Sequence, residues 1–232
     1  MKLFPEGILL VDKPSGRTSF SIVACVRKKT GQATVGHAGT LDPFATGLLV
    51  LLLGRPWTRQ AATFLHHDKE YEATFRLGQE RDSYDRDGAV VATSHSVPTL
   101  QEIESSLCHF QGEYWQTPPM FSAKKIGGKR LYELARRGID VERQPTLVKI
   151  ATTLLSYSYP DLRVYIHCSK GTYVRAIAQD LGKRLGCLAY VEQLRRTACG
   201  HFSIAEALPF TTVEALTPEA AQTVMVRKVM ST

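Results

Sequence analysis

The feature that most constrains the fold of this chain is an unbroken apolar run, GLLVLLLG, at residues 47–54. A short run bounded by glycines is typical of a strand buried on both faces, although its periodicity alone does not exclude a buried helix. Asp42 lies just before the run, in GHAGTLDPFAT, and therefore in a loop at the edge of a rigid core. Seen from this loop alone, an aspartate that caps the turn is favoured over a catalytic one, because Asp-Pro turns are common.

Alternation and helical spacing predict further elements. Strands are expected at KEYEATFRLG (69–78), with Tyr71 on the apolar face, and at LRVYIHCS. A strand in ILLVDKPSG should lead into a helix in TSFSIVACVRKKTG, capped by Thr18 or Ser19 and ended by Gly31. Other helices are expected in VPTLQEIESSLCHFQG, KRLYELARRG and KGTYVRAIAQDLGKRLG. Arg175 lies in the first turn of the last helix, where the helix dipole disfavours a cation, so an anionic group should face it.

The length and cysteine content bound the class of protein. A chain of 232 residues can bury a large core as one large domain or two small ones. We expect a soluble, intracellular protein, because no run is long and apolar enough to span a membrane and the start lacks the features of a signal peptide. The five cysteines are scattered and odd in number, which argues against a disulfide framework and a zinc site. We interpret them as small buried hydrophobes.

The charge of the chain is compatible with an anionic partner such as nucleic acid. Lysine and arginine total 29 against 22 acidic residues, which gives a net charge of +7. Residues 124–149 hold eight basic residues and three acids. From composition alone, this segment is equally compatible with a solvated helix face and with a surface that binds phosphates.

Several blocks together make the chain resemble one family. GHAGTLDPFATGLLVLLLG resembles the signature of the bacterial tRNA pseudouridine-55 synthase (TruB) family. The blocks GILLVDKPSGRTS, KEYEATFRLG, PPMFSAKKIGGKRLYELARRG, IHCSKGTYVRAIAQDLG and VEQLRR follow in the order of that family, over roughly the first 200 residues. Because of this resemblance, the catalytic interpretation of Asp42 is now favoured over the interpretation as a turn cap.

The resemblance implies an α/β (α+β) pseudouridine synthase fold, with a mixed, largely antiparallel sheet flanked by helices and a central RNA-binding cleft. It implies an isomerase that converts uridine to pseudouridine in the T-loop of tRNA, with the target base flipped out of the loop. The family needs no metal and no redox cofactor. We expect tRNA as the partner, no membrane association, no obligatory protein partner, a monomer and a cytoplasmic location.

The resemblance also implies roles for single residues. Asp42 is the catalytic carboxylate, as nucleophile or as base toward the sugar, and Arg175 pairs with it. Tyr71 stacks on the flipped uracil, where the alternative is a core tyrosine. Tyr173 and Leu194 match pocket-wall residues, and for Leu194 a plain core leucine is nearly as good an interpretation. His37 helps to hold the flipped loop, unless it is a turn histidine bonded to the backbone.

Further expectations concern support and RNA contact. Lys13 is expected to support the site or contact phosphate rather than perform chemistry. A basic insertion near residues 118–149 is expected to contact RNA through Lys124, Lys129, Arg130, Arg136 and Arg137. The catalytic domain is expected at 1–210, with 211–232 as a short tail that is too small for the C-terminal PUA-type domain common in the family. Phe121 stands where the family usually has tyrosine, which keeps the ring and removes a hydroxyl.

Two alternatives remain at this point. One is a non-catalytic tRNA-binding or folding protein with the same fold, for which loss of Asp42 would have been the mark. The other is a glycosylase that releases free uracil, whereas a synthase leaves the mass of the RNA unchanged.

Overall fold

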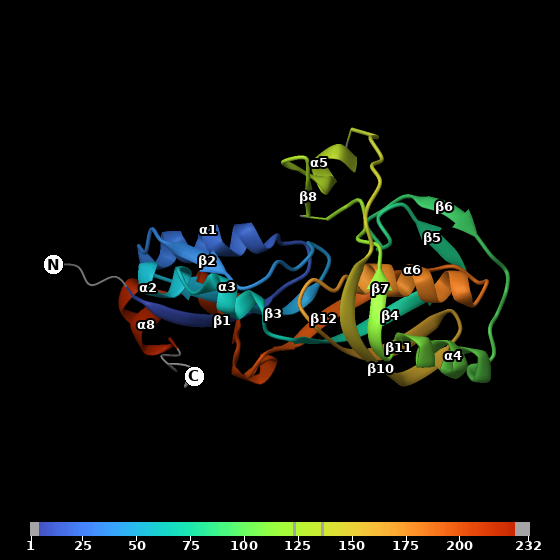
Figure 1. Cartoon of the computed structure of the whole chain (residues 1–232). Helices are drawn as coiled ribbons and strands as arrows, with labels where there is room; N and C mark the ends of the chain where they lie inside the picture. The colour runs from blue at the N-terminus through green and yellow to red at the C-terminus, as the bar shows by residue number, and fades with distance from the viewer. Residues whose placement is uncertain (1–4, 123, 136, 226–232) are drawn as a thin grey trace. The chain divides into compact units, whose positions relative to one another are not determined.

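A computed structural model of the chain describes residues 5–122, 124–135 and 137–225 (Figure 1). The chain divides into two compact units. The first unit combines Met1–Tyr71 with Arg195–Thr232, and the second unit is the continuous segment Glu72–Leu194. Each unit is described by itself below.

The first unit is built on a sheet in the order β14-β1-β3-β12, with β2 added to β3 and β13 added to β12. β1 pairs antiparallel with β3 and parallel with β14, while the end of β12 runs parallel to the start of β3. The strand bounds are β1 Gly7–Lys13, β2 Val35–His37, β3 Thr46–Leu53, β12 Ala189–Cys199, β13 Phe202–Ser203 and β14 Leu208–Pro209. Of β12, only the part from Arg195 onward belongs to the first unit.

The apolar run forms β3, and both faces of this strand are buried. Leu48–Leu53 all have 0% exposure. Leu49, Leu51 and Leu53 pack on one side with α1 (Ser19–Thr30), whereas Leu48, Val50 and Leu52 pack on the other side with Phe64 and Phe202. The prediction of a strand is therefore confirmed. The loop of Asp42 leads directly into this buried strand.

The helices of the first unit follow from their ends and their apolar faces. Thr18 caps α1 through its side chain, and Gly31 ends the helix at a φ of 70°, as predicted. The two short helices α2 and α3 span Arg55–Thr58 and Ala61–Leu65. Residues after 209 form α7 (Phe210–Glu214) and α8 (Pro218–Thr223), which contact α1. Phe210, Val213 and Leu216 join the same core cluster as α1.

The second unit contains a sheet in the order β12-β4-β11-β10-β7 and two separate hairpins, β5-β6 and β8-β9. The strands predicted at 69–78 and 162–168 are confirmed as β4 and β11, and Leu162, Val164, Ile166 and Cys168 are all buried. The strand bounds are β4 Lys69–Leu77, β5 Gln79–Arg81, β6 Val90–Thr93, β7 Gly112–Gln116, β8 Lys125–Ile126, β9 Lys129–Arg130, β10 Thr146–Ser158 and β11 Asp161–Cys168.

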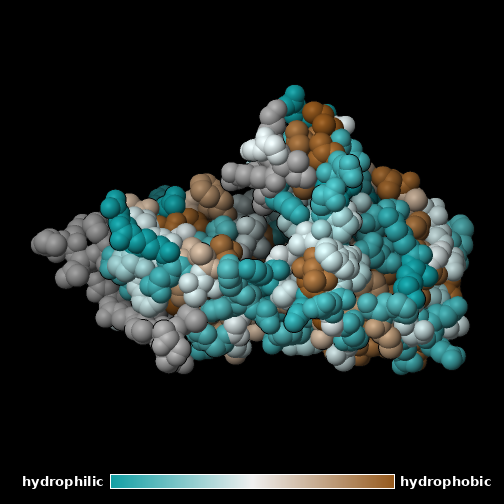
Figure 2. Space-filling model, viewed as in Figure 1, coloured by the Kyte–Doolittle hydropathy of each residue, from teal (hydrophilic) through white to brown (hydrophobic). Residues whose placement is uncertain are grey.

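The helix expected in KRLYELARRG is shorter than predicted. It forms α5 (Leu131–Ala135), which directly follows the β8-β9 hairpin, and only Leu131 and Leu134 of this helix are buried. Gly138 follows at a φ of 68°, which ends the short segment. Hydrophobic side chains are visible on the surface of this part of the chain in Figure 2.

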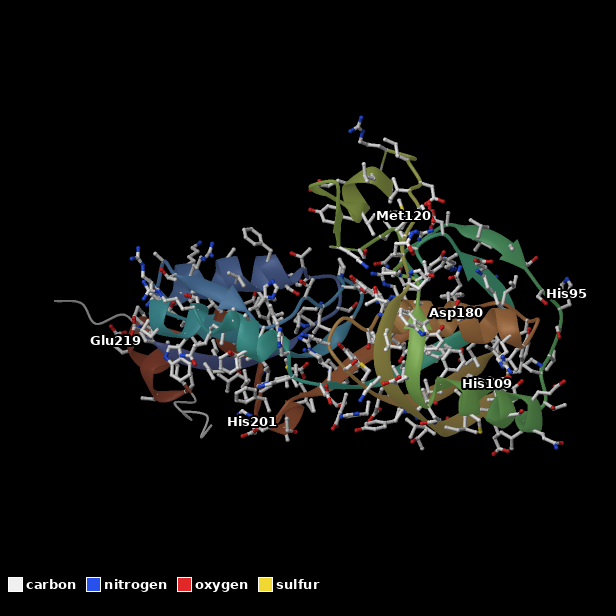
Figure 3. The ribbon with its side chains drawn as sticks, viewed as in Figure 1. His95, His109, Met120, Asp180, His201 and Glu219 are labelled. Atoms are coloured by element: carbon white, nitrogen blue, oxygen red, sulfur yellow. The ribbon has the colours of Figure 1, made fainter. Side chains whose placement is uncertain are left out.

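Two longer helices pack on the sheet of the second unit. α4 (Leu100–Leu107) starts with a capping box at Thr99 and Glu102 and contacts β10 and α6. α6 (Val174–Arg184) carries Asp180, which accepts a hydrogen bond from Tyr114 on β7 (Figure 3). The short 3-10 turns η1 and η2 span Cys108–Phe110 and Ile204–Glu206.

The fold class is as predicted: a mixed α/β structure with a mostly antiparallel sheet flanked by helices. All five cysteines are free, but the prediction that they are buried was wrong for two of them. Cys108, at the start of η1, is exposed, whereas Cys25 is half-buried and packs against the core cluster from the edge of α1. No helix in the described part of the chain is long and apolar enough to cross a membrane.

Candidate functional site

Asp42 lies in the loop between β2 and β3, and its side chain is half-buried. Ser19, the first residue of α1, holds this loop through two bonds to Leu41. Its hydroxyl accepts from the Leu41 N–H at 2.9 Å and donates to the Leu41 carbonyl at 3.1 Å. The Ala45 N–H donates to the carbonyl of Asp42 itself at 3.1 Å. The backbone on both sides of the carboxylate is therefore fixed.

Lys13 fastens the same loop to the end of β1. Its side chain is 0% exposed, and its Nζ donates to the carbonyls of Pro14 (2.9 Å), Arg17 (2.8 Å) and Pro43 (3.1 Å). Burial lowers the pKa of Lys13 from 10.5 to about 8, while the charge of Asp42 opposes this shift and that of Arg196 adds to it. All three hydrogen bonds hold backbone oxygens, which agrees with a supporting role.

Arg196 is a second buried cation in the loop region, and its burial was not predicted from the sequence. It is 1% exposed, and its guanidinium donates to the carbonyls of Leu48 (2.7 Å) and Gly39 (3.2 Å). Its own backbone pairs with Gly47, where a Cβ atom would lie 2.3 Å from the Arg196 carbonyl oxygen. The block VEQLRR contained this residue, but nothing in a strand pattern distinguishes a buried arginine from an exposed one.

His37 lies at the end of β2, half-buried, directly before the loop. Its Nδ1 atom is buried and has no hydrogen-bond partner among the described residues. Burial and the charge of Arg196 lower the pKa of His37, so the ring is neutral at physiological pH. The alternative of a turn histidine bonded to the backbone through Nδ1 thus finds no support in the described contacts.

Tyr71 and Leu194 both lie on buried strand faces. Tyr71 is the third residue of β4 and is 8% exposed, which confirms that it faces the apolar side. Leu194 is on β12 and is 7% exposed. Burial of this degree is expected both for a core residue and for the wall of a pocket, so their roles toward uracil stay predictions.

Arg175 lies in the first turn of α6 and is 4% exposed. Within the second unit its Nη1 lies 3.4 Å from a carboxylate oxygen of Asp85, which is itself buried, and donates to the Ser83 carbonyl at 3.0 Å. Its Nη2 donates to the carbonyl of Phe121 at 2.8 Å. The expected anion opposite this arginine is therefore present in Asp85, which was not predicted and lies in the polar segment QERDSYDRDG (79–88).

Asp85 is itself held in place by its own turn. Its carboxylate accepts from the Ser83 hydroxyl at 2.6 Å and from the Asp87 N–H at 3.1 Å. The signal that could have identified Asp85 is the expectation of an anionic group opposite Arg175, together with the several aspartates of this turn. Asp42 and Arg175 belong to different units of the chain. Their pairing stays a prediction.

Of the other residues predicted for the second unit, some have described side chains and others do not. Tyr173 is the N-cap residue of α6, half-buried, and its N–H donates to the side chain of Gln116 at 3.0 Å. Among the basic residues near 118–149, Lys124 donates to the hydroxyl of Thr146 at 3.0 Å, and Arg137 is exposed. Arg136 and the side chains of Lys129 and Arg130 lie outside the described residues.

Comparison with known proteins defines the class. The model of the TruB family pseudouridylate synthase N-terminal domain matches residues 27–174, and that of the tRNA pseudouridylate synthase B C-terminal domain matches residues 175–231. A crystal structure of a Cbf5-Nop10-Gar1 complex contains a similar chain, with a TM-score of 0.71 and 26% identity over 90% of this chain and 54% of that one. The fold and the carboxylate loop thus belong to the class of pseudouridine synthases.

Curated relatives narrow this class. The tRNA pseudouridine synthase B of Chlamydia pneumoniae is 55% identical over 88% of this chain and 86% of its own length. That of Protochlamydia amoebophila is 56% identical over 88% of this chain and 78% of its own length. The chain belongs to the TruB family of pseudouridylate synthases and is accordingly an isomerase.

Proposed function

We propose that this chain converts uridine 55 in the T-loop of tRNA to pseudouridine, with Asp42 as the catalytic carboxylate. Family membership and relatives that bear the name tRNA pseudouridine synthase B support the substrate. The observation that carries the role of Asp42 is the way its loop is held. Lys13 and Ser19 fix the backbone at Leu41 and Pro43, on either side of the acid, while the carboxylate itself is not fully buried. Such preorganisation is what a reacting group needs.

The proposed reaction rearranges one nucleotide without a change in composition. The bond between N1 of uracil and C1′ of the ribose breaks, the uracil turns, and a bond forms between C5 and C1′. The proton on C5 is lost and N1 gains a proton, so no oxidant or co-reactant is needed. Asp42 acts on the sugar, either by bonding to C1′ or by removing a sugar proton, and the two routes share the need for its charge.

The remaining residues are proposed to receive the flipped base. Tyr71 stacks on the uracil, because an extruded base replaces its lost neighbours by an aromatic ring. Tyr173 and Leu194 line the pocket. His37, whose lowered pKa keeps its ring neutral, helps to hold the flipped loop. Arg175, oriented by Asp85, supports the carboxylate chemistry as in the family.

We propose that binding of the tRNA backbone relies on the basic segment near 118–149, and that the enzyme acts as a cytoplasmic monomer. The catalytic domain is proposed to span 1–210. α7 nevertheless joins the core of the first unit through Phe210 and Val213, and Val224 and Met225, which follow α8, pack against the same cluster.

The test is Asp42→Asn, which keeps the shape of the side chain and removes its charge. We expect pseudouridine formation in unmodified tRNA, mapped with carbodiimide, to vanish. Thermal stability and tRNA affinity should stay close to those of the parent, because phosphate contacts and stacking do not need this carboxylate.

Two outcomes would contradict the proposal. Near-normal product formation by a verified Asp42→Asn protein would remove Asp42 from the mechanism. Release of free uracil by the parent protein, seen as a loss of RNA mass, would instead identify a glycosylase.

A further inference from the structure

Phe20 exposes its ring on the first turn of α1, although the other large apolar residues of this helix are buried. Its exposed fraction is 67%, whereas Ile22, Val23 and Val26 are 0–2% exposed. Figure 2 shows hydrophobic side chains that reach the surface over α1. A phenylalanine with this exposure contributes little to folding, so its ring is free to contact another molecule.

The backbone that carries Phe20 is fastened to the loop of Asp42. The residue before it, Ser19, forms both hydrogen bonds to Leu41. The Gly16 N–H donates to the Pro43 carbonyl at 2.9 Å, and the Ser15 hydroxyl donates to the Phe44 carbonyl at 3.0 Å. The ring of Phe20 is thus presented by the same rigid backbone that positions the catalytic carboxylate.

The rest of the exposed face of α1 suits a nucleic acid strand. Phe20, Ala24 and Lys28 are spaced four residues apart, form one row along the helix and are all exposed. The row places an aromatic ring and a cation about 12 Å apart, with only a small side chain between them. The helix contains no acidic residue, and its last turn carries Arg27, Lys28 and Lys29.

We propose that Phe20 stacks on an unpaired base of the RNA loop that flanks the target uridine, and that Lys28 neutralises a phosphate farther along the same strand. Unpaired bases of RNA loops are bound by aromatic side chains in this way, and the surrounding cations bind the backbone. The inference rests on the proposed function, because it takes the RNA loop around the target uridine as the ligand. It assigns Phe20 to substrate binding and positioning, and not to the chemical step.

The test compares variants at position 20 in tRNA affinity and in single-turnover pseudouridine formation. Phe20→Ala should weaken binding about tenfold, because the stacking of one base on the ring is lost. Phe20→Leu keeps an apolar side chain without a π-face and should weaken binding as much as Phe20→Ala does. Phe20→Trp keeps an aromatic ring and should bind tRNA as tightly as the parent. The single-turnover rate at saturating tRNA should stay near that of the parent, while the concentration needed for half-saturation rises. Val91→Ala, on β6 at 59% exposure, is the matched control for loss of an exposed apolar group.

Salt dependence separates the two residues of the row. Lys28→Ala should reduce the slope of log affinity against log salt by about 1, whereas Phe20→Ala should leave the slope unchanged. Parental affinity of Phe20→Ala would overturn the proposal, and rescue by Phe20→Leu would overturn stacking. Because the affinity measurement needs no turnover, these outcomes are distinct from a failure of the proposed function, in which the parent binds tRNA without modifying it. If the parent does not bind tRNA at all, both proposals fall.

Discussion

Lys13 illustrates, at the scale of one residue, how a buried cation can serve geometry instead of chemistry. The ammonium group of Lys13 loses its hydration on burial, because the side chain is 0% exposed. Hydrogen bonds to three carbonyls replace the lost water contacts. One of the three bonds, to the carbonyl of Pro43, ties the end of β1 to the residue after Asp42. The position of the carboxylate therefore depends on a side chain that need not touch the substrate.

The pKa of Lys13 predicts how stability depends on pH. Folding lowers this pKa from 10.5 to about 8, so between these values the unfolded chain binds more protons than the folded one. The contribution of Lys13 to the free energy of unfolding should therefore rise with pH from 8 to 10.5, and the cost of its buried charge should be fully present below pH 8.

The measurement is urea denaturation of the parent and of Lys13→Met across this pH range. The difference in free energy of unfolding, parent minus variant, should grow in favour of the parent as the pH rises. A difference that stays constant would mean that the pKa of Lys13 is not lowered in the folded protein.

At this scale, the sequence could predict residues whose motif or strand face is distinctive. Asp42 was singled out because it lies in the block GHAGTLDPFATGLLVLLLG. The burial of Tyr71 followed from alternation along one strand. Asp85 and Arg196 were missed because their roles depend on partners far away in the chain: Asp85 pairs with Arg175, and Arg196 with the carbonyl of Leu48. A charged residue in a turn or a strand gives no local signal of such a pairing.

The contact between β3 and β12 shows what a single glycine permits at the scale of elements. Gly47 has a φ of 100°, and its missing side chain lets the backbone of Arg196 approach closely. The pairing of these two residues brings β12 against the start of β3, directly after the loop of Asp42.

We predict that Gly47→Ala lowers the free energy of unfolding by about 3 kcal/mol or more, because both the backbone conformation and the close contact resist a Cβ atom. The control is Gly112→Ala: this glycine has a φ of 80°, but a Cβ atom there meets nothing within 4 Å. It should cost only about 1 kcal/mol. Equal losses in chemical denaturation would show that crowding at Arg196 is not the cause.

Elements with strong local signals were predictable, and others were not. The caps of α1 and the alternation of β4 and β11 specified those elements locally. β10 (Thr146–Ser158) was not predicted, because exposed Leu147 and Leu155 and buried Thr152 interrupt the apolar pattern and its register shifts between Leu154 and Ser156. α5 was predicted too long, since helical spacing alone cannot reveal that the preceding residues form the β8-β9 hairpin.

For the whole molecule, the net charge of +7 predicts a salt-dependent affinity for tRNA. Within the basic segment the described cations differ: Lys124 bonds to Thr146 and Arg143 donates to the Pro118 carbonyl, while Arg137 is exposed. Arg137→Glu should therefore weaken tRNA binding and reduce the salt slope by roughly 1. Arg59→Glu, at an exposed position in the first unit, controls for the change in net charge. If both variants behave alike in filter-binding titrations, the segment makes no specific phosphate contact.

The split of the first unit into two stretches of chain has a consequence for biosynthesis. Its core cluster needs Phe210, Val213 and Leu216, which the ribosome adds only after the whole second unit, Glu72–Leu194, has been made. The second unit is continuous and can fold while translation proceeds. The nascent chain therefore has to keep the apolar β1 and β3 without their final cover until late in translation, a period in which exposed strands are prone to aggregate.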